Sequence, residues 1–403
     1  MKLLQINVTS NWGSTGRIVE DIGKEAIERG ITSFVAYGRN ANNSISNTIR
    51  IGTIMDIYVH YIQTRLLDRQ GLASVGATKD LVDEIIKIAP DIIHLHNIHG
   101  YYLNFPILFK FLAQANIPVI WTLHDCWSFT GHCTHYSFIG CKRWQTSCHN
   151  CPQRRMYPKS LLFDRSRKNF VDKLNYFTSM KNLTLVTVSQ WLASEIAKSF
   201  LKKYPTHVIH NGVDTEVFTP MIGKKNDFGI AEHKFVILGV ASVWSPRKGL
   251  QDFFYLRQYL SADYIIILIG LDKKQIESLP KGIIGLQRTN SINELAKYYS
   301  IADVYLNTSV EETFGLTTVE SLSCGVPAIV YNSTACTEVI SKETGIVVEP
   351  HDIKGIARVL QKMKINEIIF DPQKCRERAV CFFNKNIQYS KYINLYNSIL
   401  KLE

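Results

Sequence analysis

The chain has 403 residues, of which 46% are hydrophobic and 20% are charged, as in an ordinary folded protein. This length favours two domains of roughly 150–200 residues each rather than one hydrophobic core. No apolar run reaches the about 18 residues of a membrane span, and the opening segment MKLLQINV predicts a buried strand rather than a signal peptide. We therefore expect a cytoplasmic protein.

The net charge of +11 indicates an acidic partner: a phosphorylated substrate, anionic lipid or nucleic acid. No nucleic-acid-binding module accompanies the charge, so nucleic acid is not expected. Basic and apolar side chains are interleaved over residues 154–173. This segment predicts either a basic amphipathic helix on an anionic membrane surface or a core-facing helix with a solvated basic side.

The first predicted element is an apolar strand at 2–8, followed by a turn with Gly13 and Gly16 and by a helix with apolar residues at helical spacing. A parallel α/β domain begins in this way. The turn lacks the G-x-G-x-x-G pattern, so a dinucleotide cofactor is not expected. The two glycines serve either a ligand loop or only the geometry of the turn.

Polar residues end two further predicted strands of this domain. His96 ends the strand at 91–96, and His124 and Asp125 follow the strand at 117–123. Ligands of open parallel sheets lie beyond the carboxyl ends of the strands, so these residues are site candidates, although a lone histidine is more often a packing residue. Other strands are expected at 33–37 and 183–189.

Cysteines are concentrated between residues 126 and 151, in a segment that we interpret as an insertion after the His124 strand. Disulfides are not expected in a reducing compartment. A C-x-x-C pair with two upstream cysteines supplies enough thiolates for a structural zinc site. The predicted ligands are Cys133, Cys141, Cys148 and Cys151. Buried cysteines without a metal are the alternative, since free cysteine is itself a small core residue.

A turn at Asn211-Gly212 marks the passage into a second domain. The segment KFVILGVASVWSPRKGLQDFF then predicts a strand, a loop and a helix that opens near Gly249. Lys248 is placed to meet a diphosphate, and Arg247 adjoins it; a surface Lys/Arg pair is the alternative. Further strands are expected at 264–269, 283–286, 303–307, 326–331 and 344–349.

The stretch SVEETFGLTTVESLSCGVPAIVYNSTACTE at 309–338 predicts a loop, a helix, a tight turn and a strand. The helix opens at Phe314, Gly315 and Leu316, and a helix N-terminus with a glycine is suited to hold phosphate. Glu312 and Glu320 flank this anion site and would not help to bind phosphate alone. Their natural partners are hydroxyls, so the pattern predicts a nucleotide sugar as ligand.

The spacing Glu312-x7-Glu320 in EETFGLTTVESLSCGVPAI resembles the signature of retaining GT-B glycosyltransferases, in particular glycosyltransferase family 4. The N-G-V-D segment from Asn211 and P-R-K-G around Lys248 resemble the same family. The resemblance implies two Rossmann-like parallel-sheet domains that face across a cleft, with a last helix that returns to the first domain. The implied ranges are 1–207 with the Cys-rich insert, 208–385, and 386–403.

The resemblance also implies roles for these residues. Glu320 would bind the ribose hydroxyls, Glu312 the hydroxyls of the donor sugar, and His124 the sugar or the reacting oxygens. The glycine-rich loop with Gly13 and Gly16 would lie near the donor phosphates and the acceptor. Ser242 stands where the family usually has an arginine, so the diphosphate clamp with Lys248 is incomplete unless Arg247 replaces it.

The implied activity is transfer of a sugar from a UDP- or GDP-sugar, with retained anomeric configuration, to a glycan or a lipid-pyrophosphate-linked acceptor in capsule or lipopolysaccharide assembly. The leaving phosphate oxygen would take the acceptor proton, and the chemistry would need no metal or other cofactor. The protein would then be cytoplasmic and peripheral at the inner face of the plasma membrane. The alternatives are a nucleotide-sugar epimerase on the same fold and an inactive zinc-stabilised sugar-binding scaffold.

Overall fold

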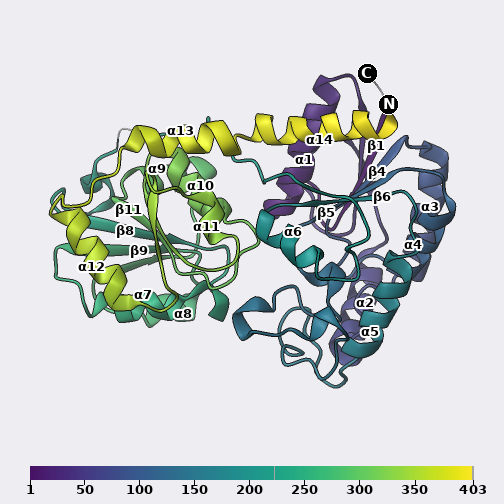
Figure 1. Ribbon diagram of the computed structural model, residues 1–403, viewed down its shortest axis with the longest axis horizontal. Coiled ribbons are helices and arrows are strands. Elements are labelled where there is room, and N and C mark those ends of the chain that lie inside the picture. The colour runs from purple at the N-terminus through teal and green to yellow at the C-terminus, as the bar shows by residue number, and fades with distance from the viewer. Residues whose placement is uncertain (222, 402–403) are drawn as a thin grey trace. The chain divides into compact units, whose positions relative to one another are not determined.

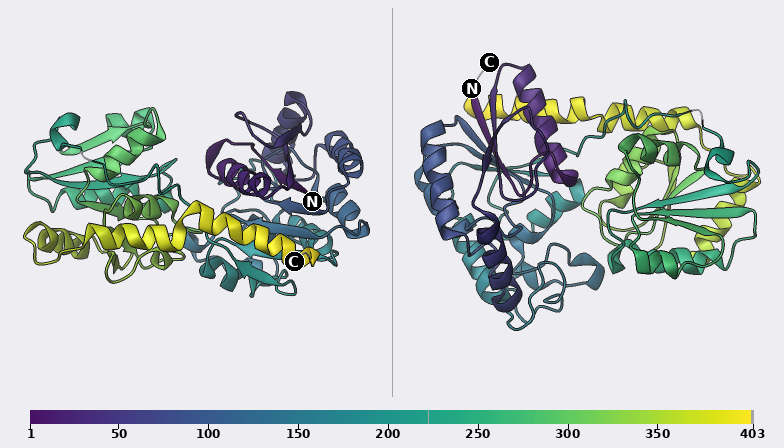
Figure 2. Two further views of the ribbon diagram at one scale, coloured as in Figure 1. Left: turned by 90° about the horizontal axis from the view of Figure 1, so that it is seen from above. Right: turned by 180° about the vertical axis from the view of Figure 1, so that it is seen from behind.

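The computed structural model describes residues 1–221 and 223–401, which form two compact units. The first comprises Met1–His210 and the chain from Gln388 on, and the second comprises Asn211–Ile387. Each unit is a parallel sheet covered by helices (Figures 1 and 2). In the described ranges, no helix has both the length and the apolar character needed to cross a bilayer.

The sheet of the first unit has seven parallel strands in the order β3-β2-β1-β4-β5-β6-β7. Their bounds are β1 Lys2–Asn7, β2 Thr32–Tyr37, β3 Asn47–Arg50, β4 Ile92–Leu95, β5 Val119–Leu123, β6 Leu183–Thr187 and β7 Thr206–Val208. Central strands such as β5 are buried along their whole length, as expected where helices cover both faces of a parallel sheet. The short edge strands β3 and β7 were not predicted because their side chains are exposed or only half-buried and show no apolar run.

The helices of the first unit are α1 Gly13–Glu28, α2 Ile54–Leu67, α3 Val75–Ile88, α4 Phe105–Gln114, α5 Ser166–Phe177, α6 Gln190–Ile196 and most of α14 Lys385–Leu400. In α14, Tyr392 and Tyr396 pack with Leu3, Ile22 and Ile120 in the core of this unit. The Tyr396 hydroxyl lies 2.7 Å from Nδ1 of His94 on β4. The expected return of the last helix to the first domain is therefore confirmed.

The basic segment at 154–173 differs from the predicted helix. Helix α5 begins only at Ser166, and residues 154–165 are irregular. Pro158 interrupts a helix there, and side chains bond the backbone instead, as where Ser166 N donates to Asp164. Lys173 is buried: its Nζ donates to the carbonyls of Trp127 and Thr130 and lies 3.5 Å from the centre of the Trp127 ring. The expectation that the basic residues of this segment lie on a solvated side is therefore wrong for Lys173.

The second unit has a six-stranded parallel sheet in the order β10-β9-β8-β11-β12-β13. Its strands are β8 Phe235–Val240, β9 Tyr264–Ile269, β10 Ile283–Leu286, β11 Val304–Asn307, β12 Ala328–Tyr331 and β13 Gly345–Val348. Its helices are α7 Leu250–Arg257, α8 Lys273–Glu277, α9 Ile292–Ser300, α10 Leu316–Ser323, α11 Cys336–Val339, α12 Ile353–Lys364 and α13 Pro372–Phe383. The strand order reverses between β8 and β11, and between β1 and β4 in the first sheet, where ligands of such sheets bind.

Candidate active site

Two loops of the second unit meet beside the point where its strand order reverses. One follows β8 and ends in a 3-10 turn at Pro246–Lys248, and the other follows β11. Thr308 Oγ1 donates to the Lys248 carbonyl at 2.8 Å, which joins them. Gly249 has a φ of +70°, and a Cβ there would lie 2.3 Å from the Thr308 carbonyl oxygen. Only glycine lets these loops come so close.

The two loops bring Arg247, Lys248 and Glu312 together. Lys248 Nζ forms an ion pair with Oε1 of Glu312, and Arg247 Nη1 lies 3.9 Å from Oε2. Arg247 also donates to the Glu311 carbonyl at 2.8 Å. Burial favours the neutral form of Glu312, but the two cations outweigh it and hold the pKa of this carboxyl below its usual value. Arg247 thus lies beside Lys248, whereas Ser242 is an exposed loop residue.

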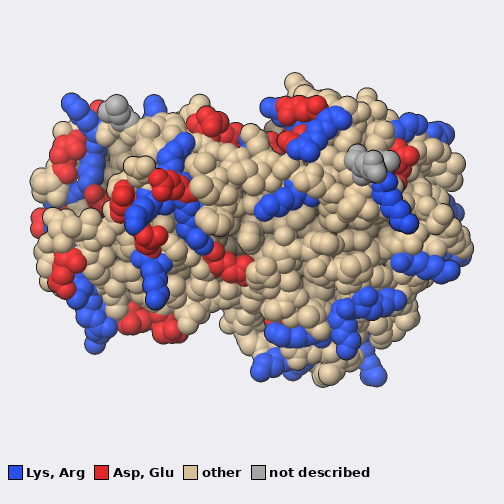
Figure 3. Space-filling model, turned by 45° about the horizontal axis from the view of Figure 1, so that its top comes forward, with Lys and Arg blue, Asp and Glu red and all other residues tan. Residues whose placement is uncertain are grey.

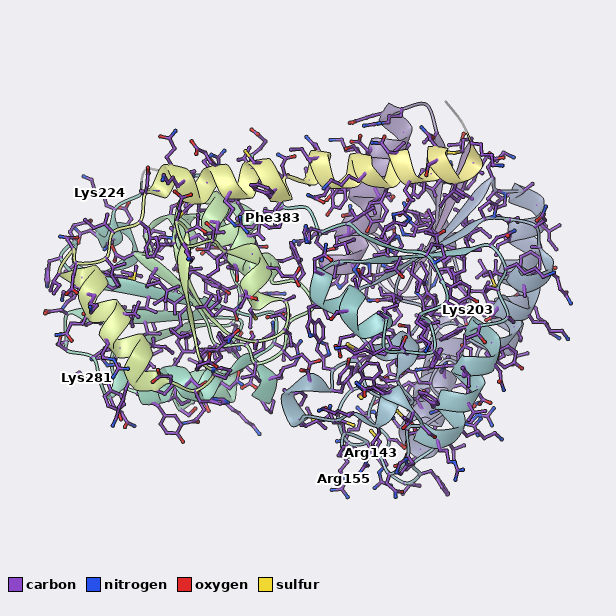
Figure 4. The ribbon with its side chains drawn as sticks, viewed as in Figure 1. Arg143, Arg155, Lys203, Lys224, Lys281 and Phe383 are labelled. Atoms are coloured by element: carbon purple, nitrogen blue, oxygen red, sulfur yellow. The ribbon has the colours of Figure 1, made fainter. Side chains whose placement is uncertain are left out.

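Helix α10 begins immediately after this ion-pair cluster. Gly315 precedes its first residue, Leu316, with a φ of +104°, and a Cβ there would make only ordinary contacts, so the backbone angle is what requires glycine. Phe314 is buried with its ring 5.6 Å from that of Phe383, which Figure 4 shows at the end of α13. A helix N-terminus presents backbone N–H groups that can bind an anion. In α10 the N–H of Thr318 already donates to the Gly315 carbonyl at 3.0 Å, so the N–H groups of Leu316 and Thr317 precede the first bond within this turn.

Glu320 lies on the second turn of the same helix. Its Oε2 accepts a hydrogen bond from the Tyr299 hydroxyl at 2.8 Å, and its side chain is half-buried. Burial raises the pKa of Tyr299 well above its usual value, so the phenol stays protonated and donates to Glu320. Sequence reasoning missed Tyr299, because a tyrosine at helical spacing gives no signal beyond packing.

In the first unit, the expected strand-end residues gather around a small pocket at the ends of β4 and β5. Nδ1 of His96 lies 3.1 Å from Nε2 of His124. Burial lowers the pKa of His124 to about 4, so its imidazole is neutral at pH 7. Neutral imidazole can donate or accept a hydrogen bond, but it adds no positive charge to this site.

Asp125 lies in the same pocket, with Oδ2 2.8 Å from Nε2 of His99 and Oδ1 accepting from the Trp127 N–H. Burial opposes ionisation of Asp125, yet these partners lower its pKa to about 2, so it is a carboxylate. His99 was not predicted as a site residue. Its position three residues after His96, in the same strand-end stretch HNIHG, was the available signal.

The glycines after β1 have different structural reasons. Gly13 is the first residue of α1, with a φ of +67° and open space where a Cβ would be. A Cβ on buried Gly16 would lie 2.7 Å from Oγ1 of Thr9, so that position requires glycine for packing. Open space at Gly13 leaves room for a ligand, whereas Gly16 fixes the turn.

Four of the insert's cysteines, Cys133, Cys141, Cys148 and Cys151, line one small cavity together with His132. The Cys133 and Cys151 thiols are hydrogen-bonded to each other, and Cys148 Sγ accepts from the Gly131 N–H at 3.2 Å. In residues 1–221 and 223–401, no three His, Cys, Asp or Glu side chains are already set as metal ligands would be.

The fold and the site define a class of protein. Two Rossmann-like parallel-sheet units are the GT-B architecture, and solved glycosyltransferases share it. Sucrose-phosphate synthase from Thermosynechococcus elongatus matches with a TM-score of 0.72 and 18% identity over 100% of both chains. Anabaena HepE in complex with UDP and glucose matches with a TM-score of 0.68 and 16% identity over 99% of both chains.

Sequence comparison identifies the family. The Glycosyltransferase Family 4 profile matches residues 15–217, and the Glycosyl transferases group 1 profile matches residues 224–380. The chain therefore belongs to glycosyltransferase family 4. It is 24% identical over 433 aligned positions to an Escherichia coli K12 protein assigned to colanic acid biosynthesis as the glycosyl transferase WcaC, covering 99% of this chain and 100% of the relative.

Proposed function

We propose that this glycosyltransferase moves a sugar from a UDP- or GDP-sugar to a glycan or lipid-pyrophosphate-linked acceptor in surface polysaccharide synthesis. The carrying observation is the convergence of Arg247, Lys248 and Glu312 immediately before the N-terminus of α10. The complex of HepE with UDP and glucose supports the donor class, and the colanic acid assignment of the E. coli relative supports the polysaccharide context.

In this proposal the donor diphosphate binds at the α10 N-terminus and competes with Glu312 for Lys248. The carboxylate so released accepts hydrogen bonds from the donor sugar, while Lys248 and Arg247 stabilise the negative charge that grows on the leaving diphosphate. In this proposal Arg247 takes the role of the arginine that the family usually has at the position of Ser242. Neutral His124 bonds the sugar hydroxyls, with Asp125 and the loop of Gly13 near it.

The acceptor attacks from the face that the diphosphate leaves, and the leaving phosphate oxygen takes its proton. The anomeric configuration is then retained, and fixed cations provide the charge stabilisation for which other transferases use a metal. Product analysis by NMR tests this account: it predicts nucleoside diphosphate and an α-linked product from an α-linked donor. An inverted linkage, or an epimerised donor without transfer, would contradict it.

We expect Glu320→Ala to abolish stabilisation by the nucleotide, because this variant loses the carboxylate proposed to bind the ribose. Wild-type protein with ligand at 100 times its Kd should gain about 2.7 kcal/mol in free energy of unfolding. Tyr299→Phe is the matched partner variant: it keeps the Glu320 carboxylate but removes the hydroxyl that orients it, so a smaller loss is expected. Thermal shift with UDP and GDP measures both; unchanged stabilisation of Glu320→Ala would refute the ribose assignment.

The lipid-linked part of the proposal is supported by α2, whose amphipathic pattern is reversed. This helix buries the polar residues His60 and Thr64. It exposes large apolar side chains: Ile54, Met55, Tyr58, Val59, Ile62, Leu66 and Leu67. A helix of a water-soluble protein normally does the opposite, so this face is suited to an apolar environment.

The apolar face of α2 continues into the loop at residues 161–163. Leu161, Leu162 and Phe163 are exposed, and Leu161 N donates to the Arg65 carbonyl of α2 at 2.7 Å. An adjoining groove of about 650 Å³ carries four cations and a single carboxylate, Asp164. These cations are Arg69, Arg165, Arg167 and Lys168. Figure 3 shows Lys and Arg predominating along the lower edge of the first unit.

Exposed apolar groups beside cations complement an anionic lipid leaflet, so we propose that this surface docks the enzyme on the membrane that holds its acceptor. The protein should float with vesicles containing phosphatidylglycerol, and binding should weaken as salt rises. Phe163→Glu should reduce flotation strongly, whereas Ile369→Glu, at an even more exposed apolar site of the second unit, should not. Equal flotation of both variants would contradict the docking surface.

A further inference from the structure

The insert encloses a small cavity that the proposed sugar transfer does not use. Its lining includes His132, Cys133, Cys148 and Cys151. Cys133 and Cys148 are buried, and the Cys133 thiol is hydrogen-bonded to that of Cys151. Several sulfur atoms thus face one space that is far too small for a sugar or a nucleotide, which limits its ligand to a single ion or a water.

His132 provides the second, independent observation. Its imidazole is fully buried, with Nδ1 2.7 Å from Oδ1 of Asp68. The opposite nitrogen, Nε2, has no hydrogen-bond partner within the part of the chain that the structure describes. A buried polar nitrogen without a hydrogen-bond partner lowers the stability of the folded protein by about 1–3 kcal/mol. Such a nitrogen is therefore expected where a bound ion or water serves as its partner. Histidines that bind metal through Nε2 hold Nδ1 against a carboxylate in this way.

We propose that the insert binds one structural Zn²⁺ ion through His132 Nε2 and the sulfurs of Cys133, Cys148 and Cys151. Three thiolates and one imidazole are a ligand set that selects zinc and closes its tetrahedral coordination. The set replaces Cys141, a half-buried cysteine expected from spacing alone, with a histidine that spacing did not indicate.

Zinc binding would rearrange the thiols that now bond each other. Metal binding removes the thiol protons, so the hydrogen bond between Cys133 and Cys151 is exchanged for bonds to the ion, and rotation about each Cα–Cβ bond brings the sulfurs to it. We therefore do not expect these sulfur atoms to have the arrangement of metal ligands while the thiols are hydrogen-bonded to each other.

Neighbouring groups suit the negative charge of a site with three thiolates. The N–H of Gly131 already donates to Cys148 Sγ, and Gly131 has no room for a Cβ, which would lie 2.6 Å from the Cys148 Cβ. Buried Lys173 is held nearby by the carbonyls of Trp127 and Thr130. Trp127 also donates its backbone N–H to Asp125. The ion would therefore also stabilise the edge of the pocket that contains Asp125, where the sugar is proposed to bind.

Metal analysis of the purified full-length protein tests the proposal, with one zinc per chain expected. Replacement of zinc by Co²⁺ should produce the sulfur-to-cobalt charge-transfer absorption of a thiolate site. His132→Gln and Cys148→Ser should each lose most of the metal, while Cys126→Ala, in the same insert but outside the cavity lining, should retain it. Less than about half an equivalent of zinc, or iron in its place, would overturn the proposal.

X-ray absorption spectroscopy of the wild-type protein identifies the zinc ligands without any variant, so it tests the proposal even if a variant fails to fold. The proposal predicts three sulfur ligands and one nitrogen ligand around zinc. Four sulfur ligands, together with loss of metal in Cys141→Ser but not in His132→Gln, would overturn the assignment of His132. These readouts do not depend on sugar transfer, so they are independent of the proposed function.

Discussion

Glu312→Gln protein should still bind the donor nucleotide but transfer sugar at least ~100-fold more slowly, as when one group that stabilises a transition state is removed. The amide keeps the shape of the side chain but lacks the charge that pairs with Lys248 and Arg247 and that accepts the sugar hydroxyls. Single-turnover kinetics with saturating donor measures the loss in the transfer step itself.

Glu343→Gln is the matched control for this variant, since Glu343 is an exposed carboxylate of the same unit that pairs with Lys374. Its transfer rate should equal that of the wild type. Full activity of Glu312→Gln would remove the proposed role of the carboxylate, whereas loss of nucleotide binding would show that Glu312 acts in binding rather than in transfer.

Lys248→Met should reduce kcat/KM by about 10²–10³-fold, because it removes a fixed cation from the proposed leaving diphosphate. Lys248→Arg should recover part of the activity, since it restores the charge with a different shape. Lys281→Met, at an exposed lysine of the same unit that Figure 4 labels, should have no effect. A Lys248→Met enzyme with wild-type kcat/KM would contradict the phosphate role.

The same ion pair predicts how stability depends on pH. The folded-state pKa of Glu312 lies below the ordinary value of 4.5, so its ionised form stabilises the folded protein above about pH 4.5. That contribution is lost as the pH falls through the lowered pKa. In Lys248→Met this acid-dependent loss should be smaller, because the largest stabilising partner of the carboxylate is absent; urea unfolding at neutral and acidic pH compares the two proteins.

Strong local patterns made most of the fold predictable. The buried strands β1, β5 and β9 are apolar runs followed by helical periodicity, and such repetition defines a parallel α/β sheet. The edge strands β3 and β7 escaped prediction because pairing with a neighbour, rather than their own composition, makes them strands. The segment at 154–165 escaped because its side-chain bonds to the backbone have no periodic signature.

Candidate site residues were recognisable from the sequence where they belong to a motif of adjacent residues. Lys248, Glu312 and Glu320 lie in such motifs, and the structure brings the first two into contact. Partners such as Tyr299 and His132 become visible only when separate segments of the chain meet: Tyr299 bonds Glu320, 21 residues later, and His132 bonds Asp68, 64 residues earlier. Spacing alone therefore indicated four cysteines for the proposed metal site, while the buried imidazole opposite Asp68 needed coordinates.

Binding of a nucleoside diphosphate sugar to the second unit can be measured with a thermal-shift panel of UDP, GDP, ADP and their common sugar conjugates. We expect stabilisation by the nucleotides of one base at ligand concentrations well above Kd, and loss of this stabilisation in Glu320→Ala. Wild-type protein that is stabilised by none of these ligands would contradict the account and favour a sugar-binding scaffold without transferase activity.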